Sequence, residues 1–194
     1  MSVRFLDPRT NEVVYPEPLQ TNAITPHLGT NARVDINPLL APTALLWDVK
    51  SPIETLEGQL PWEMRSKLGQ SATRPPSAQL QLQSPHLPWR VQVRPKTPNL
   101  FVTVFDVLAT LREVLWLEIT PGEWGQFSTG RKDRIVAERG ARVADYDPHH
   151  RVNSLYRHPI RVDTLEEFTC FGGLIPAPGR GPGCLDLRFE RRRR

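Results

Sequence analysis

The stretch that decides the fold runs from residue 102 to residue 113 and reads VTVFDVLATLRE. Its first residues are mostly apolar and β-branched, which is typical of an extended segment. Thr103 and Asp106 then stand at the spacing of a capping box, in which each side chain accepts a hydrogen bond from the other residue's backbone N–H. Apolar residues recur from there with helical spacing. The stretch therefore predicts an extended entry into a capped amphipathic helix at the centre of one folded domain.

Two further helices are predicted downstream of this one. Residues 120–123 read TPGE, which provides a hydroxyl cap, a proline at the first helical position and an acid at the third. These features predict a short helix that carries Trp124 and Phe127. Residues 132–143 show helical spacing again, although Gly140 weakens this segment by about 1 kcal/mol relative to alanine.

Strands are predicted on both sides of the helices. Residues 44–49 form a compact apolar run that is typical of a buried strand. Residues 79–83 and 89–94 alternate between apolar and polar, which predicts a hairpin with one face in water and with His86 facing solvent in its turn. Three more segments resemble strands: residues 160–165, residues 171–175 (where Gly172 and Gly173 indicate a bulge or a close backbone approach) and residues 184–189. We expect an α+β fold with a mainly antiparallel sheet of five to six strands and about three helices packed on one face.

The length and composition bound the domain organisation. A chain of 194 residues suits one domain with appendages. Its 20 prolines are about twice the average usage of roughly 5%, which favours interrupted elements and long loops. We expect a proline-rich arm over residues 1–33 that is extended or disordered, a single α+β domain over residues 34–190, and a basic tail over residues 191–194.

The net charge of +4 comes from the last four residues, Arg191, Arg192, Arg193 and Arg194. Without them the chain has 21 basic and 21 acidic residues. A folded nucleic-acid surface would interleave basic and aromatic residues, so we expect no nucleic-acid partner except through these four arginines. The chain has no apolar run near the ~20 residues that span a bilayer, so no membrane partner is expected. The N-terminus lacks the apolar run of a secretory signal, so the cytoplasm, or the nucleus by diffusion, is the expected compartment.

The order of these segments resembles DUF6699, a family of unknown function common in basidiomycete fungi. The matching motifs are NPLL from residue 37, LWDV from 46, VTV from 102, DVL from 106, EW from 123, a helix ending near 139, RVD from 161, Phe171 with Gly173 and Leu174, and a final strand. The similarity spans roughly residues 36–189, and it departs from the family where Cys184 stands in place of an expected tryptophan. The resemblance implies a small cytosolic α+β domain from such a fungus, and it implies no activity.

Four residues could carry a hydrolytic reaction. Asp147, His149 and His150 lie in one loop, and such groups can bind a divalent metal that activates water. Adjacent histidines in a loop share no fixed face, however, so neither a metal nor another cofactor is predicted. Cys170 would be a nucleophile beside a histidine base, but its phenylalanine neighbours favour a buried, inert thiol. Whether Cys170 pairs with Cys184 stays open.

Six further residues are candidates either for a ligand site or for structural pairing. The charged ones lie at or beside apolar segments, where an unpaired charge would be costly. They are expected to pair with one another and to tie helix to sheet; the alternative is that they line a cleft together with two tryptophans. The set is Trp47, Asp48, Trp124, Arg139, Arg161 and Asp163.

These observations favour a non-catalytic protein-binding or scaffolding module. The prolines of residues 1–33 would make that arm a preformed extended ligand or strand donor for a protein partner. The alternative is a small metal-assisted or cysteine-dependent hydrolase built on the four residues named above.

Overall fold

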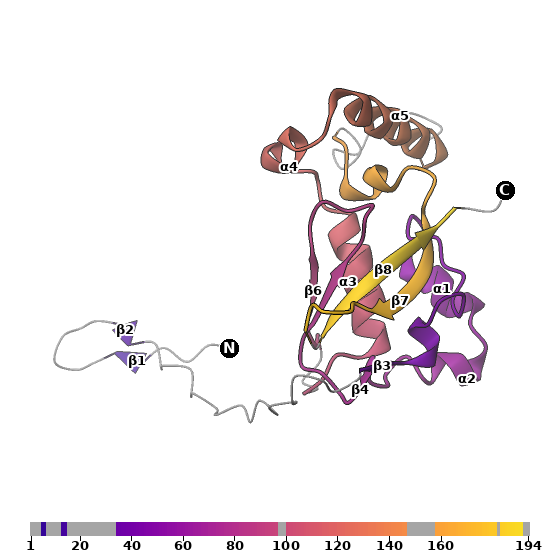
Figure 1. The fold of residues 1–194 in the computed structure, drawn as a ribbon, viewed down its shortest axis with the longest axis vertical. Coiled ribbons are helices and arrows are strands. Elements are labelled where there is room, and N and C mark those ends of the chain that lie inside the picture. The colour runs from indigo at the N-terminus through magenta and orange to yellow at the C-terminus, as the bar shows by residue number, and fades with distance from the viewer. Residues whose placement is uncertain are drawn as a thin grey trace. The chain divides into compact units, whose positions relative to one another are not determined.

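The computed structural model of the chain describes residues 5–6, 13–14, 34–96, 100–146, 158–181 and 183–191. The chain forms two compact units, Met1–Asn31 and Ala32–Arg194. In the first unit, β1 (Phe5–Leu6) pairs antiparallel with β2 (Val13–Val14). The second unit holds every other described element (Figure 1).

The main sheet of the second unit has four strands in the order β6-β5-β8-β7. The predicted hairpin of β5 (Leu80–Gln83) and β6 (Val91–Val93) is confirmed, with Leu80 opposite Val93. A second antiparallel hairpin joins β7 (Cys170–Pro176) to β8 (Cys184–Glu190). Parallel pairing between β5 and β8 joins the two hairpins into one sheet.

The expectation of a single sheet with five to six strands is wrong for two reasons. Residues 44–49 form no strand, although Asp48 makes an isolated bridge to Cys170 at the start of β7. Residues 160–165 turn into the 3-10 helix η3 (Arg161–Leu165), because the Asp163 carboxylate accepts a hydrogen bond from the Ile160 backbone N–H and closes a turn. A separate two-stranded sheet pairs β3 (Asp35–Ile36) with β4 (Thr73–Arg74).

The three predicted helices are present, and their caps explain where two of them begin. α3 (Val104–Leu115) and α4 (Pro121–Gly125) each begin at a complete capping box, made by Thr103 with Asp106 and by Thr120 with Glu123. α5 (Thr129–Tyr146) begins earlier and ends later than the sequence indicates, and it runs without interruption through Gly140. Among the described residues, three short helices precede them: η1 (Pro38–Leu40), α1 (Ile53–Gln59) and α2 (Trp62–Arg65).

The sequence led us to expect all the helices on one face of the sheet. The structure differs from this expectation. α3 packs against the sheet through β6, whereas α5 packs against η3. Figure 1 shows α4 and α5 beyond one end of the sheet. The large amphipathic surface of α3 is therefore the one that closes the core.

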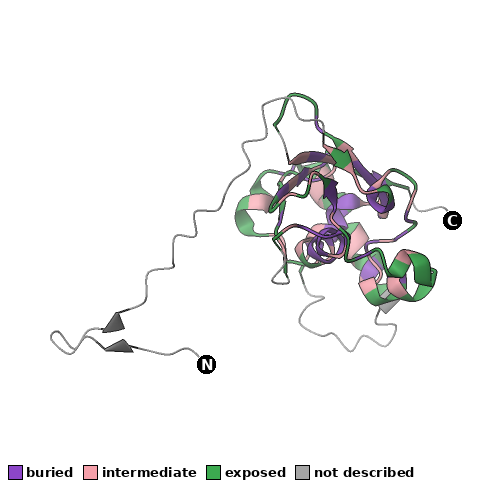
Figure 2. Cartoon of the chain, turned by 90° about the horizontal axis from the view of Figure 1, so that it is seen from below, coloured by how far each residue is buried: buried purple, intermediate pink, exposed green. Residues whose placement is uncertain are grey.

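The core forms between α3, the sheet and the segment before α1, and Figure 2 shows the buried residues gathered there. Gly173 makes this packing possible. Its φ is +96°, a β-bulge interrupts the register between Phe171 and Gly173, and a Cβ at this position would lie 2.6 Å from the Cα of Pro42. Both parts of the prediction for the glycine pair, a bulge and a close backbone approach, are confirmed.

Candidate functional site

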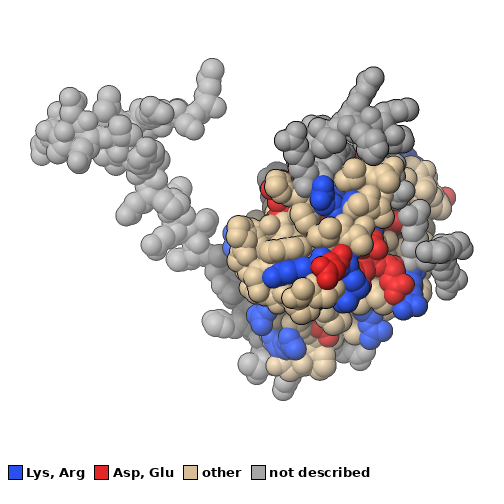
Figure 3. Space-filling view, turned by 90° about the horizontal axis from the view of Figure 1, so that it is seen from above, with Lys and Arg blue, Asp and Glu red and all other residues tan. Residues whose placement is uncertain are grey.

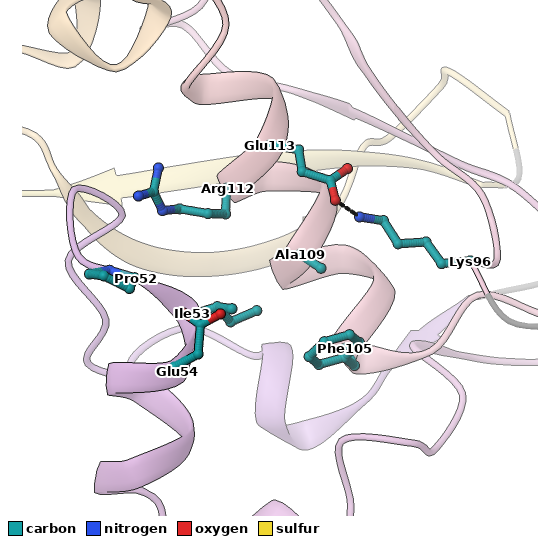
Figure 4. A pocket seen from close by; sticks show the side chains of 8 residues that line it. All are labelled: Pro52, Ile53, Glu54, Lys96, Phe105, Ala109, Arg112 and Glu113. Carbon is teal, nitrogen blue, oxygen red and sulfur yellow. Dashed lines mark hydrogen bonds and ion pairs between the residues drawn. The ribbon is translucent and has the colours of Figure 1, made fainter. Parts of the chain in front are cut away.

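A hollow of about 450 Å³ opens between α3 and the start of α1 (Figure 4). Its apolar lining includes Phe105 and Ala109 from α3 and Ile53 from α1. Small-molecule sites have volumes of about 300–1,000 Å³. The hollow is therefore large enough to receive an apolar group.

The sequence of α3 explains why the hollow lies there. Phe105, Ala109, Arg112 and Glu113 follow one another at i, i+4, i+7 and i+8, so they share a helix face. All four line the hollow. The small side chain of Ala109 leaves room where a larger residue would fill the space between the helices.

One side of the rim is fixed to the start of α3. The Lys96 ammonium and the Glu113 carboxylate form an ion pair, drawn as a dashed line in Figure 4. The Lys96 backbone N–H also donates to Oδ1 of Asp106 at 3.1 Å, while Oδ2 of Asp106 accepts from the Thr103 N–H at 2.9 Å. One carboxylate therefore caps α3 and holds the segment that carries Lys96.

The other notable rim residue is Arg112, whose guanidinium lies on the indole ring of Trp116. The guanidinium carbon is 3.5 Å from the centroid of the ring. The Trp116 Nε1–H donates to the backbone carbonyl of Val49 at 3.3 Å, which holds the indole in place. The guanidinium carbon of Arg142 lies 6.0 Å from the same ring. Trp116 thus fixes the orientation of Arg112.

Arg142 also makes the most buried ion pair among the described residues. Its Nε lies 2.7 Å from Oδ1 of Asp163 and its Nη2 lies 3.0 Å from Oδ2, and both side chains have 0% exposure. The pair ties α5 to η3. Sequence reasoning selected Asp163 but missed Arg142, although its position seven residues after the buried Ile135 places it on the inward face of α5.

Arg161 pairs with Glu123 and ties η3 to α4. Its Nη2 lies 2.6 Å from Oε1 of Glu123, and its guanidinium carbon lies 4.9 Å from the ring centroid of Trp89. Partial burial would raise the pKa of the Glu123 carboxyl, but hydrogen bonds from the Thr120 N–H and from Arg161 outweigh it and lower that pKa. Arg161 thus pairs with Glu123, a residue outside the predicted set.

The remaining members of the predicted set lie apart from the hollow. Trp47 is buried in the core, and the Oδ1 of the half-buried Asp48 accepts the Lys50 N–H at 2.9 Å, which closes a turn. Trp124 is half-buried on α4, and Arg139 is half-buried on α5. None of the six predicted residues is among the eight that line the hollow. Their sequence signal, charge beside apolar segments, does not distinguish a structural residue from a binding residue.

The residues of the hydrolase alternative are not brought together in the part of the chain that the structure describes. Asp147, His149 and His150 lie outside it. Cys170 and Cys184 stand at the first residues of β7 and β8 and form no disulfide with each other. Among the described residues no group of three or more His, Cys, Asp or Glu side chains could hold a metal ion.

The first 33 residues are described only at β1 and β2, and Arg192, Arg193 and Arg194 lie outside the described residues. Arg191 is described: its Nη2 lies 2.7 Å from Oε1 of Glu167. None of the described helices has the length and apolar character needed to cross a bilayer.

His86 departs from its expected exposure to solvent. It lies in the turn between β5 and β6, is half-buried, and has its ring centroid 4.5 Å from that of Phe168. The Arg131 Nη2–H donates to the His86 backbone carbonyl at 2.8 Å. Burial lowers the pKa of His86 most, and the positive charge of Arg131 lowers it further. The negative charge of Glu166 raises this pKa, but by less.

Comparisons with known proteins give one match. The sequence model described as "Family of unknown function (DUF6699)" matches residues 45–183, a range that includes every residue lining the hollow. No curated protein and no solved structure matches the chain.

Proposed function

The chain belongs to the DUF6699 family, whose function is unknown, and from that premise we propose that this protein is a non-catalytic protein-binding module. The site that we assign to this function is the hollow between α1 and α3. The observation that carries the proposal is the combination of an apolar floor with a charged rim. Protein interfaces have the same anatomy, with an apolar centre and a polar edge.

The chemistry of the lining supports binding over turnover. The eight lining residues include no serine, threonine, cysteine or histidine, which are common nucleophiles and proton carriers. Of the two carboxylates at the rim, that of Glu113 is engaged by Lys96. The hollow therefore offers a surface for recognition without an evident nucleophile–base pair.

The rigidity of the walls also supports the proposal. The capping box of Thr103 and Asp106 fixes the start of α3, and the stack of Arg112 on Trp116 fixes the rim. A site that is already ordered loses little conformational entropy when a partner binds. Such a site can hold a partner through a small contact area.

The test is a selection of random displayed peptides on the immobilised protein, followed by affinity measurements on variants. Ala109→Phe places a large side chain in the hollow, and Ala137→Phe makes the same change at an exposed position on α5. We expect selected peptides to lose at least about tenfold in affinity, or about 1.4 kcal/mol, on Ala109→Phe and to keep it on Ala137→Phe.

The proposal is wrong if no peptide is selected, or if all selected peptides bind both variants as they bind the parent protein. Circular dichroism and a melting curve show whether Ala109→Phe is folded. If it is not, Ile53→Ser removes part of the apolar lining from α1 and serves as the second variant.

Residues 1–33 and the cellular setting belong to the same proposal. We propose that the proline-rich arm makes its own extended contact with a protein partner, and that the protein acts in the cytoplasm of a basidiomycete fungus, as the family resemblance implies. Deletion of residues 1–33 is expected to leave the binding of selected peptides unchanged, because the residues that line the hollow all lie between 52 and 113.

A further inference from the structure

In the part of the chain that the structure describes, the main sheet has one uncovered edge, at β6, and two exposed arginines stand along it. We propose that this edge binds an extended acidic segment of a protein partner. The segment adds to β6 as a fifth strand and places one acidic side chain beside Arg90 and another beside Arg94. Neither arginine lines the hollow between α1 and α3, so the inference goes beyond the proposed function.

The two edges of the sheet differ in what covers them. At β7 the Phe171 N–H donates to the Trp47 carbonyl at 2.7 Å, and the Val49 N–H donates to the Thr169 carbonyl at 2.9 Å. The segment before α1 therefore occupies that edge. β6 lies at the other margin of the sheet (Figure 1), and β5 is the one described strand with which it pairs. The outer side of β6 is thus available to a further strand.

The backbone of β6 points its free groups out from this edge. The Gln81 N–H donates to the Gly183 carbonyl at 2.8 Å, so the backbone of Gln81 faces β8. Gln81 stands opposite Gln92, and in such an antiparallel pair both residues turn their N–H and C=O groups away from each other. The groups of Gln92 therefore point outward, and those of Arg90 and Arg94 do the same by alternation. An added strand uses such groups as a ladder of hydrogen bonds.

The side chains of the edge carry positive charge without a counter-charge. Arg90, Gln92 and Arg94 are exposed and alternate with the buried Val91 and Val93, so the three share the solvent face of the sheet. Among the described residues neither arginine makes an ion pair or a side-chain hydrogen bond. The neighbouring strand β5 reads LQLQ and offers no acid. An acid on an added strand would supply the missing charge.

Several other arginines already have carboxylate partners. Arg134 pairs with Glu166 at 3.0 Å, and Arg161 pairs with Glu123 at 2.6 Å. Basic and acidic side chains also lie side by side on the face that Figure 3 shows, at the end of the molecule with α4 and α5. Opposite charges directly across two paired strands attract, and like charges repel. The arginines of β6 therefore favour an acidic strand over a basic one.

A second copy of this chain fits the edge less well than an acidic partner. If two β6 strands paired antiparallel about Gln92, Arg90 of each copy would stand opposite Arg94 of the other. Charged side chains on an edge strand commonly prevent such self-association. The same two charges that exclude a second copy thus select a partner with acids four positions apart.

The first test measures charge selection by fluorescence anisotropy on the full chain. The probe is a labelled peptide TEVTVET, whose two acids have the spacing of Arg90 and Arg94, and TKVTVKT is its basic counterpart. We expect the parent protein to bind the acidic peptide and not the basic one. Arg94→Glu should weaken the acidic peptide at least about threefold, and Arg90→Glu with Arg94→Glu at least about tenfold, with binding of the basic peptide gained. Arg188→Glu, on an exposed residue of β8, should change the affinity less than about twofold.

The second test measures the backbone ladder. Gln92→Pro removes the outward N–H of the edge, where proline is tolerated, and Gln92→Ala removes only the side chain. We expect Gln92→Pro to weaken the acidic peptide at least about tenfold and Gln92→Ala to keep its affinity. If Gln92→Pro lowers the melting temperature, an acidic peptide with an N-methyl group on its central threonine replaces this variant, and the same loss is required.

The inference is overturned if the acidic peptide does not bind at about 1 mM, because Arg90 and Arg94 would then only protect the edge from other strands. Equal binding of the acidic and basic peptides, or of the N-methylated and unmodified ones, also overturns it. Ala109→Phe should leave the acidic peptide unaffected. A loss on that variant would place the peptide in the hollow and overturn the inference, while the selected peptides test the proposed function separately. Displacement of the peptide by an oligouridine whose binding depends on Arg94 would assign the arginines to RNA and overturn the inference.

Discussion

Arg142 and Asp163 face each other inside the protein with two parallel hydrogen bonds, Nε to Oδ1 at 2.7 Å and Nη2 to Oδ2 at 3.0 Å. Neither side chain has any exposed surface. Oδ2 of Asp163 also accepts the Ile160 N–H at 2.9 Å. One carboxylate therefore orders η3 and attaches α5 to it, 21 residues away along the chain.

Asp163→Ala should destabilise the protein by about 3–5 kcal/mol, because it leaves the Arg142 guanidinium buried without its counter-ion. Urea denaturation followed by tryptophan fluorescence measures this change. The control is Glu138→Gln, which breaks the half-buried pair of Lys50 and Glu138 and should cost about 1 kcal/mol or less. The double change Arg142→Met with Asp163→Leu should recover part of the lost stability, because it removes the buried charge but still leaves the Ile160 N–H without its acceptor. Equal effects of the two single changes would contradict this account.

His86 should make the stability depend on pH. Its pKa in the folded protein is lower than 6.5, through burial against Phe168 and then the charge of Arg131, so the folded state binds this proton less readily than the unfolded state. The contribution of neutral His86 is complete above about pH 6.5 and is lost as the pH falls from there through the lower pKa of the folded state. Urea denaturation at about pH 7.5 and about pH 5.5 measures the resulting loss of unfolding free energy.

The control for this prediction is His86→Gln, which has no titrating ring in the β5–β6 turn. The fall in unfolding free energy between the two pH values should be smaller in this variant than in the parent protein. An equal fall in both proteins would show that other groups cause the pH dependence.

Gly173→Ala should destabilise the protein by more than the free energy needed to hold an alanine at a positive φ. The φ of +96° disfavours any L residue, and the added Cβ would lie 2.6 Å from the Cα of Pro42, in the backbone between the core residues Leu40 and Leu45. Gly179→Ala is the matched control, since its φ of +76° is also positive but no atom lies within 4 Å of the added Cβ. Thermal melting should show a much larger fall for Gly173→Ala. Similar falls would mean that the contact with Pro42 is not tight.

Gly140→Ala should stabilise the protein by about 0.5–1 kcal/mol. Gly140 is exposed in the interior of α5, and no atom lies within 4 Å of an added Cβ. Alanine reduces the entropy of the unfolded chain and has the higher helix propensity. An increase in the urea midpoint with an unchanged slope is the expected measurement. A decrease would show that this face of α5 is covered in a way that the described residues do not reveal.

The parts of the fold that sequence reasoning predicted correctly depend on short-range contacts. Thr103 with Asp106 and Thr120 with Glu123 make hydrogen bonds across three residues, so the spacing alone places the start of α3 and of α4. The alternation on both sides of the turn at His86 likewise identified β5 and β6. The prediction of a strand at residues 160–165 was wrong. The apolar residues of this segment are equally compatible with a strand, but the Asp163 carboxylate accepts the Ile160 N–H and holds a turn instead.

The sequence by itself determined the α+β class, the capped helix at the centre and the β5–β6 hairpin, because each follows from interactions between near neighbours in the chain. Only the tertiary structure decided that β5 lies parallel to β8, that Asp163 pairs with Arg142, and that a hollow opens over Ala109. These features join segments that are remote in sequence, and several residues could satisfy the same local pattern. The choice among them depends on which side chains meet when α1, α3, α5 and the sheet pack together.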